Sequence, residues 1–210
     1  DWSSDVCSSD LSDSFGNNMI EDVAGSSDIT TEDGNDVITS GADADTIKAG
    51  NGNNIIKSGA GNDIIFTGNG ADQIWSGGGQ DIIRAGGGDD IIDSGAGNDQ
   101  VFGGAGADRF ILNQKLSTSL VNIQDFNASE GDRLVLERAV FDKLSAGLLG
   151  KQFVASASST ANTPDQHLIF DTRDGKLYYD PDGAGQLTPD LIATLVGVTS
   201  LSVTSINLQA

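Results

Sequence analysis

A nine-residue period runs without insertion through residues 13–111, and it is the strongest constraint on what this chain can fold into. The segment divides into eleven units, and the eighth place of every unit is apolar, with isoleucine in nine of them. The fourth place is Gly in ten units, with Asp43 as the exception, and the second place is Gly in every unit from residue 41 onward. One apolar side chain per unit cannot form a core alone, so the units must stack to bury a continuous ladder.

Each unit predicts a short strand and a tight turn. The β-branched residue at the eighth place favours a strand over places seven to nine, and the Gly places permit turns with positive φ while leaving backbone carbonyls uncovered. The array contains no Pro, so no strand amide is missing, and its Gly density excludes a helix. Two units make one coil of 18 residues, which predicts an all-β fold with a parallel β-roll of about five and a half coils.

The sixth place of each unit falls in a turn and is Asp in eight units. Alternate units share a side of the roll, so these acids form two rows, one along each edge. The first row contains Asp36, Asp72, Asp90 and Asp108, and the second contains Asp45, Asp63, Asp81 and Asp99. The array holds 17 Asp or Glu against four Lys or Arg, and carboxylates one coil apart repel each other unless something neutralises them.

Two carboxylates and several turn carbonyls make an all-oxygen site, which suits Ca²⁺ with its six to eight oxygen ligands. Mg²⁺ prefers smaller octahedral sites that keep water, and zinc or copper would require His or Cys, of which the chain has one each. The alternative is a metal-free solenoid in which Asp only caps turns.

The pattern GG-x-G-x-D-x-U-x, in which U is a large apolar residue, resembles the RTX (repeats-in-toxin) calcium-binding family over residues 13–111. The resemblance implies a parallel β-roll with ions between the turns of adjacent coils. Carried onto this sequence, it implies about five complete calcium sites: Asp45 with Asp63, Asp63 with Asp81, Asp81 with Asp99, Asp72 with Asp90, and Asp90 with Asp108. Asn18, Ser27 and Asn54 depart from the pattern at the sixth place, and Asp43 replaces a turn Gly. Besides the Asp residues, the implied metal-site positions are the turn glycines Gly59, Gly61, Gly68, Gly70, Gly77, Gly79, Gly86, Gly88, Gly95, Gly97, Gly104 and Gly106.

Both ends of the chain differ from the array. Residues 1–11 read DWSSDVCSSDL and resemble a translated sequencing adapter, so we expect residues 1–12 to be an artefact or disordered and the chain to be a C-terminal fragment. The alternative is a native disordered N-terminus. Residues 112–210 contain all three Pro and ordinary apolar runs, and they predict a β-rich cap that covers the open edges of the roll.

Within this cap, residues 121–137 predict two short strands and residues 167–185 a hairpin through Asp174 and Gly175. A short helix is expected from Thr188, and a last strand near the C-terminus. The stretches DF…GD and YYD-x-DG-x-G resemble the C-terminal part of serralysin-type proteases, which implies an uncleaved signal for type I secretion. We leave open whether Asp125, Asp132, Asp180 and Asp182 bind further calcium or only shape their turns.

The sequence therefore predicts a secreted, extracellular, calcium-binding module that performs no chemistry and folds after export, when it meets calcium. Its partners are calcium ions and, through the resemblance, the type I secretion machinery. The net charge of −20 disfavours nucleic acid, and no apolar run reaches the length of a membrane span. Two alternatives stay open: the tail of a secreted protease or lipase, whose H-E-x-x-H or G-x-S-x-G motif this chain lacks, or the spacer of an adhesin or surface-layer protein.

The outward places of the strands offer a possible docking surface. Apolar side chains at the seventh places, Ile55, Ile64, Ile82 and Ile91, could form a patch. Trp75, Phe66 and Phe102 at the ninth places are expected to cover the flanks of the roll.

Overall fold

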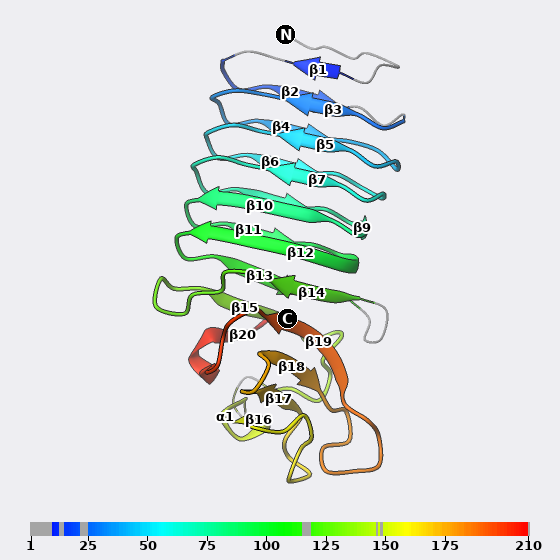
Figure 1. Ribbon diagram of the computed structural model, residues 1–210, viewed down its shortest axis with the longest axis vertical. Helices are drawn as coiled ribbons and strands as arrows, with labels where there is room; N and C mark the ends of the chain where they lie inside the picture. Colours follow the sequence, from blue (N-terminus) through cyan, green and yellow to red (C-terminus); the bar gives the residue numbers. More distant parts are fainter. Residues whose placement is uncertain are drawn as a thin grey trace.

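The fold is seen in a computed structural model that describes residues 10–12, 15–21, 25–114, 119–145, 147 and 149–209. These residues form a parallel β-solenoid of about eight coils, followed by a smaller β-rich segment (Figure 1). Two sheets face each other across the solenoid and bury its core between them. The predicted all-β class with a parallel roll and a β-rich end is confirmed.

The first sheet begins with β1 (Asp10–Ser12), β3 (Asp28–Thr30), β5 (Thr46–Lys48), β7 (Ile64–Phe66), β10 (Ile82–Gly87) and β12 (Ala96–Ala105). It continues through β14 (Leu120–Ile123), β19 (Asp190–Leu195), β18 (Lys176–Tyr179), β17 (Leu168–Asp171) and β16 (Phe153–Ser156), with β9 (Gly78–Gly79) paired to β12. The second sheet contains β2 (Met19–Glu21), β4 (Val37–Thr39), β6 (Ile55–Lys57), β8 (Gln73–Trp75), β11 (Ile91–Asp93), β13 (Arg109–Leu112), β15 (Arg133–Glu137) and β20 (Ile206–Gln209). A short helix α1 (Leu149–Gln152) and a 3₁₀ turn (Val203–Ser205) complete the elements of the described residues.

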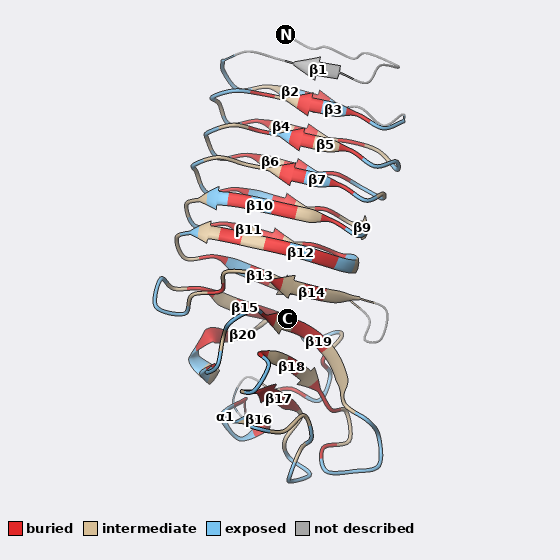
Figure 2. Cartoon of the chain, viewed as in Figure 1, coloured by how far each residue is buried: buried red, intermediate tan, exposed pale blue. Residues whose placement is uncertain are grey.

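The register of the array follows the 18-residue coil. Ile47 lies opposite Ile65, and Ile65 lies opposite Ile83, so each inward side chain stacks on its counterpart one coil away. The eighth-place side chains are buried, while the seventh and ninth places on either side are partly or fully exposed (Figure 2). The inward ladder predicted from the repeat is therefore the core of the solenoid.

The Gly places require glycine chiefly because successive turns stack closely on each other, and not only because the chain reverses there. Gly97 has φ of +136°, and a Cβ there would lie 1.5 Å from the carbonyl oxygen of Gly79 in the preceding coil. Any side chain at this place would push neighbouring coils apart, in addition to straining the backbone.

Polar side chains inside and beside the turns also link successive coils. At the first place, Ser40 Oγ donates to the carbonyl of Ser58, and Ser58 Oγ to that of Ser76, at 2.9 and 3.0 Å. At the fifth place, Asn35 Oδ1 accepts from the backbone N–H of Asn53 at 2.7 Å. The sequence interpretation missed these ladders, although small hydroxyl residues and Asn recur at these places.

The solenoid continues beyond the repeats, which contradicts the expected five and a half coils. Strands β14 and β15 add a further coil, and β19 and β20 add another, each in parallel register with the strand before it. Paired residues in β12 and β14 are 22 positions apart in the sequence, and those in β13 and β15 are 24 positions apart, instead of 18. The nine-residue period is therefore lost, and the sequence carries no repeat signal there. Phe110 and Phe126 pack at 6.0 Å between ring centroids where the period ends.

The helix expected from Thr188 is wrong, because residues 190–195 form strand β19. This strand lies between β14 and β18, so pairing on both sides overrides a weak helix-start signal. The predicted hairpin through Asp174 and Gly175 is confirmed, since β17 and β18 pair antiparallel. The two strands expected in residues 121–137 are also present as β14 and β15, but they lie in different sheets.

The N-terminal expectation differs from the structure at its last residues. Asp10–Ser12 forms β1, which pairs in parallel with β3, whereas residues 1–9 lie outside the described residues. A three-residue extended segment can pair through its backbone with an open strand edge whatever its side chains are. No helix in the described part of the chain is long and apolar enough to cross a membrane.

Candidate metal sites along the two edges

Seven of the sixth-place Asp residues lie directly before a strand, Asp99 lies within β12, and all eight side chains are buried. None of them exposes more than 1% of its surface. The two rows predicted from the repeat are present, because residues 18 apart occupy equivalent places in neighbouring coils. Burying eight acidic side chains is costly unless their oxygens find partners.

One oxygen of each carboxylate has a partner of a regular kind. In each row, Oδ1 accepts a hydrogen bond from the backbone N–H of the sixth-place residue one coil earlier. Asp63 N donates to Asp81 Oδ1 at 2.9 Å, and Asp72 N donates to Asp90 Oδ1 at 2.8 Å. These bonds fix one face of every carboxylate and orient the other oxygen in a repeated direction.

The second oxygen is without a donor in seven of the eight residues. Within the described part of the chain, the buried Oδ2 atoms that make no hydrogen bond belong to Asp36, Asp63, Asp72, Asp81, Asp90, Asp99 and Asp108. Asp45 differs, since its Oδ2 accepts from Gly41 N at 3.3 Å in the unit where Asp43 replaces the turn Gly. A repeated, buried, unpartnered acceptor requires a proton or a cation.

Asn54 shows what this second position faces. Its Oδ1 accepts from Asp36 N at 2.9 Å, as the Asp residues do from their neighbours. Its Nδ2 then donates to the carbonyl of Gly52 at 3.1 Å and to that of Gly50 at 3.4 Å. The amide nitrogen thus occupies the position that Oδ2 takes in the Asp units, next to the carbonyls of the second and fourth places.

In the Asp units these groups are all acceptors. Outside the strands of the described array, the fourth-place carbonyls of Gly61, Gly70 and Gly88 accept no backbone hydrogen bond. An ionised Oδ2 atom beside such a carbonyl cannot donate to it, whereas a cation can bind both. The donor set of carboxylate and carbonyl oxygens fits Ca²⁺.

The pKa values reflect burial above all. Nearby first-place hydroxyls of Ser58, Thr67, Ser76 and Ser94 oppose the rise in the pKa values of Asp63, Asp72, Asp81 and Asp99 without cancelling it. Burial raises the pKa of Asp90 to about 7, with additional contributions from the charges of Asp108 and Asp72. Burial likewise raises the pKa of Asp99 and of Asp108 to about 6. The pKa values of Asp63, Asp72 and Asp81 are also raised, chiefly by burial. A divalent ion between two such carboxylates would stabilise their ionised form.

The predicted glycines lie between the three-residue strands of the array or in their extensions, with Gly79 in β9, Gly86 in β10, and Gly97 and Gly104 in β12. All of them except Gly68 have positive φ, so the turn geometry that presents the carbonyls depends on them. No cluster of three or more His, Cys, Asp or Glu side chains placed to hold a metal occurs among the described residues. The sites predicted here use two carboxylates each and take their other ligands from the backbone.

The array also matches a known family. Residues 14–47, 39–74, 48–83 and 75–110 match the family model of the RTX calcium-binding nonapeptide repeat, in four copies. This array belongs to the RTX calcium-binding repeat family. The resemblance seen in the sequence is thereby confirmed.

Comparison with curated protein sequences finds no match. Among solved structures, this chain is similar to the extracellular lipase LipA from Serratia marcescens, at 14% identity and a TM-score of 0.36. The match covers 92% of this chain and 38% of the lipase chain. A likeness of this degree carries no inference about function.

The acids singled out beyond the repeats have different surroundings. Asp125 accepts from the N–H groups of Gly103 and Gly104 at 3.0 Å each, and Asp132 extends the first row. Asp180 and Asp182 lie in the loop after β18, where Asp182 Oδ2 accepts from Gln186 N at 2.8 Å. Both pairs stay predictions as calcium ligands.

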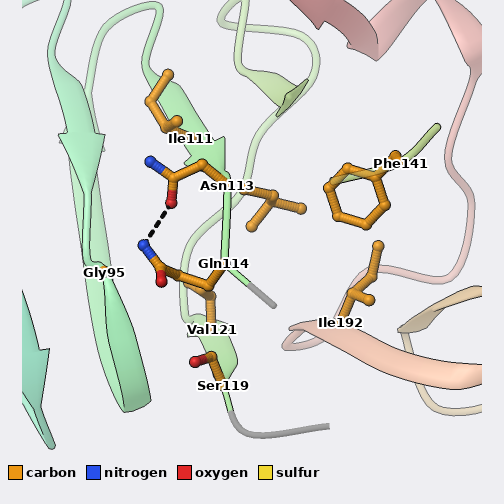
Figure 3. Close-up of a pocket in the computed structure, with 9 residues that line it drawn as sticks. Gly95, Ile111, Asn113, Gln114, Ser119, Val121, Phe141 and Ile192 are labelled. Atoms are coloured by element: carbon orange, nitrogen blue, oxygen red, sulfur yellow. Dashed lines mark hydrogen bonds between the residues drawn. The ribbon is translucent and has the colours of Figure 1, made fainter. Parts of the chain in front are cut away.

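A small cavity near the first post-repeat coil does not offer a second site. Its volume is about 20 Å³, and its lining includes Val121, Phe141 and Ile192 (Figure 3). Asn113 and Gln114 at its rim are joined by a hydrogen bond of 2.8 Å. Such a space holds about one water molecule, so it has no room for a substrate.

Proposed function

We propose that this chain is the calcium-binding module of a secreted RTX protein and that its array folds when the chain reaches extracellular calcium. The observation that carries the proposal is the set of buried Oδ2 atoms that make no hydrogen bond, in turns where the fourth-place carbonyls of Gly61, Gly70 and Gly88 accept no backbone hydrogen bond. Five pairs of aspartates supply the proposed sites, as predicted from the sequence. In this proposal, any catalytic activity resides outside the present chain.

The residues of the array would act in three ways. The sixth-place Asp side chains and the turn carbonyls hold the ion, and the positive-φ glycines give the turns their shape. When bound, calcium supplies the positive charge that removes repulsion between carboxylates of adjacent coils. Because each site is shared by two coils, the energy of binding is also energy for stacking them.

Without the ion, the same residues oppose folding. Ionised carboxylates with raised pKa values destabilise the folded state, and the Gly-rich turns lose much backbone entropy on folding. The buried core is narrow, with one large apolar side chain for every nine residues of the array. We therefore expect the calcium-free array to be largely unfolded at neutral pH.

Extracellular location and type I secretion form the second part of the proposal. Extracellular calcium modules work at dissociation constants of about 10⁻⁴ to 10⁻³ M, a concentration range that the cytosol does not reach. An array with such sites would remain unfolded inside the cell and fold outside. The resemblance of residues 112–210 to the end of serralysin-type proteases supports export by this route.

Circular dichroism and Trp75 fluorescence test the calcium-dependent folding. Trp75 lies on β8 with Lys57 Nζ 5.8 Å from its ring centroid, so its emission should report assembly of the coils. We expect a β spectrum in millimolar calcium that is lost in EGTA and that magnesium does not restore. A β spectrum of equal strength in EGTA at pH 8 would contradict the proposal.

A pair of variants separates the sites from general charge. Asp81→Asn removes a buried carboxylate between Asp63 and Asp99, whereas Asp28→Asn removes an exposed one from the flat face of β3. We expect the first to bind fewer calcium ions in calorimetry and the second to bind as many as the unmodified chain. Equal losses in both would indicate only a diffuse effect of net charge.

A further inference from the structure

The first row of carboxylates continues past the end of the repeats. Asp108 N donates to Asp132 Oδ1 at 3.0 Å, which is the same bond that joins the sixth-place residues within the array. The pairing of β13 with β15 sets Arg109 opposite Arg133, so Asp108 and Asp132 precede their strands at equivalent places. They are separated by 24 residues instead of 18, and the family match ends at residue 110.

The junction between these two coils contains an unpartnered buried acceptor. Asp108 is fully buried, and its Oδ2 makes no hydrogen bond within the described structure. That oxygen turns back into its own turn, where a Cβ on Gly103 would lie 2.3 Å from it. Like Oδ2 of Asp36, Asp72 and Asp90 in the same row, it makes no hydrogen bond.

Negative charge accumulates around this position. Asp132 is buried, and unlike Asp108 it has a donor on each oxygen, since Asp108 N donates to its Oδ1 and Asn127 N to its Oδ2 at 2.7 Å. Asp125 holds the turn that contains Gly103 and Gly104. Asp125 and Asp132 are among the charges that act on Asp108. The nearby Arg133 guanidinium donates to the carbonyls of Gly131 and Asp132 and forms no ion pair with these carboxylates in the described part of the chain.

We propose that Asp108 and Asp132 hold a further Ca²⁺ at this junction, together with turn carbonyls, and that the ion fastens the C-terminal segment to the repeat array. The proposal rests on the proposed calcium binding by the array and extends it to a coil that lacks the nonapeptide pattern. The ligand class is the same, a hard divalent cation bound by carboxylate and carbonyl oxygens.

The second row provides an internal control because it ends differently. Asp99 is buried to the same extent as Asp108, and its Oδ2 is also unpartnered among the described residues. The residue opposite it in the next strand is Val121, which offers no carboxylate. Asp99 should thus belong to one site, whereas Asp108 should belong to two.

Counting bound ions in the variants Asp108→Asn and Asp99→Asn tests this assignment. Asn54 shows that an amide fits the sixth place and keeps its hydrogen bonds, so both variants are expected to fold. Native mass spectrometry in calcium should show that the Asp108 variant loses two ions and the Asp99 variant one. A loss of one ion in both overturns the junction site while leaving the array sites standing, whereas an unmodified chain that binds no calcium overturns the proposed function itself.

A second comparison tests the fastening role. The variant Asp132→Asn should bind one ion fewer, and calcium should no longer slow amide hydrogen exchange in its strand β15. The control Glu130→Gln, which removes an exposed charge from the same loop, should keep both the ion count and the slowing of exchange. Circular dichroism in calcium checks that the array of each variant stays folded. Slowing of exchange in β15 by calcium that persists in the Asp132 variant would overturn the fastening role.

Discussion

Replacing Asp90 by Asn should stabilise the calcium-free array while removing calcium sites. Asp90 is buried, its Oδ2 lacks a donor, and burial raises its pKa from 3.8 to about 7. An amide at this place should donate to the carbonyls of its own turn, as Asn54 does to Gly50 and Gly52. The variant therefore exchanges an ionised acceptor for a neutral donor.

The magnitude follows from the pKa change. A rise of about 3 units corresponds to roughly 4 kcal/mol of destabilisation when Asp90 is fully ionised. The folded-state pKa lies above the unfolded-state value, so this cost is absent below a pH of about 4, grows up to about 7 and is constant above. The gain from Asp90→Asn should therefore be largest, about 2 to 4 kcal/mol, at pH 8 and should nearly vanish at pH 4.

Folding of the calcium-free chain can be driven by trimethylamine N-oxide in EGTA and followed by circular dichroism. We expect a lower midpoint for Asp90→Asn than for the unmodified chain at pH 8, and similar midpoints at pH 4. In calcium the order should reverse, because Asp90 belongs to two of the proposed sites. A variant that is less stable than the unmodified chain in EGTA at pH 8 would refute the reasoning.

Three further predictions concern protons, turns and core. Calcium affinity measured by calorimetry should rise from pH 5 to pH 8, because protons compete with the ion for Asp90, Asp99 and Asp108. A calcium affinity that does not change with pH would contradict the raised pKa values. Gly97→Ala should destabilise the calcium-bound array by about 2 kcal/mol or more in urea unfolding, because its Cβ would meet the Gly79 carbonyl, whereas Gly150→Ala, which has open space, should be nearly neutral. Ile65→Ala should lower the free energy of unfolding by about 2 to 4 kcal/mol in the same assay. Ile64→Ala, on the exposed face of the same strand, should lower it by less than about 1 kcal/mol. Equal losses would mean that the inward side chains are not the core.

The repeat predicted the array well because its period and the coil coincide. One apolar place in nine determines which side chain points inward, and the register of Ile65 on Ile47 and Ile83 follows from it. The edge rows follow from the same arithmetic. The burial of the carboxylates and the hydrogen bond from each N–H to Oδ1 do not, because they depend on how closely neighbouring turns stack.

The C-terminal coils could not be predicted from the sequence, and the reason is physical. Strands β14 and β15 occupy solenoid places, but the loops before them vary in length, so no fixed period marks Asp132 as the next member of its row. The strand at Leu191 and Ile192 was read as a helix because the spacing of a few apolar residues cannot show that two strands will flank it. Such pairing is decided by segments distant in sequence.

The arrangement of the coils has a mechanical consequence. Within the array each coil pairs only with the one before and the one after. Its C-terminal end is joined to the longer strands β14, β15, β19 and β20. At the other end, the first described strand has three residues. When calcium is removed, the coils should therefore unfold one after another from the less stable N-terminal end of the described array, and not all at once. The end-to-end length of the particle would serve as a gauge of the ion concentration around it.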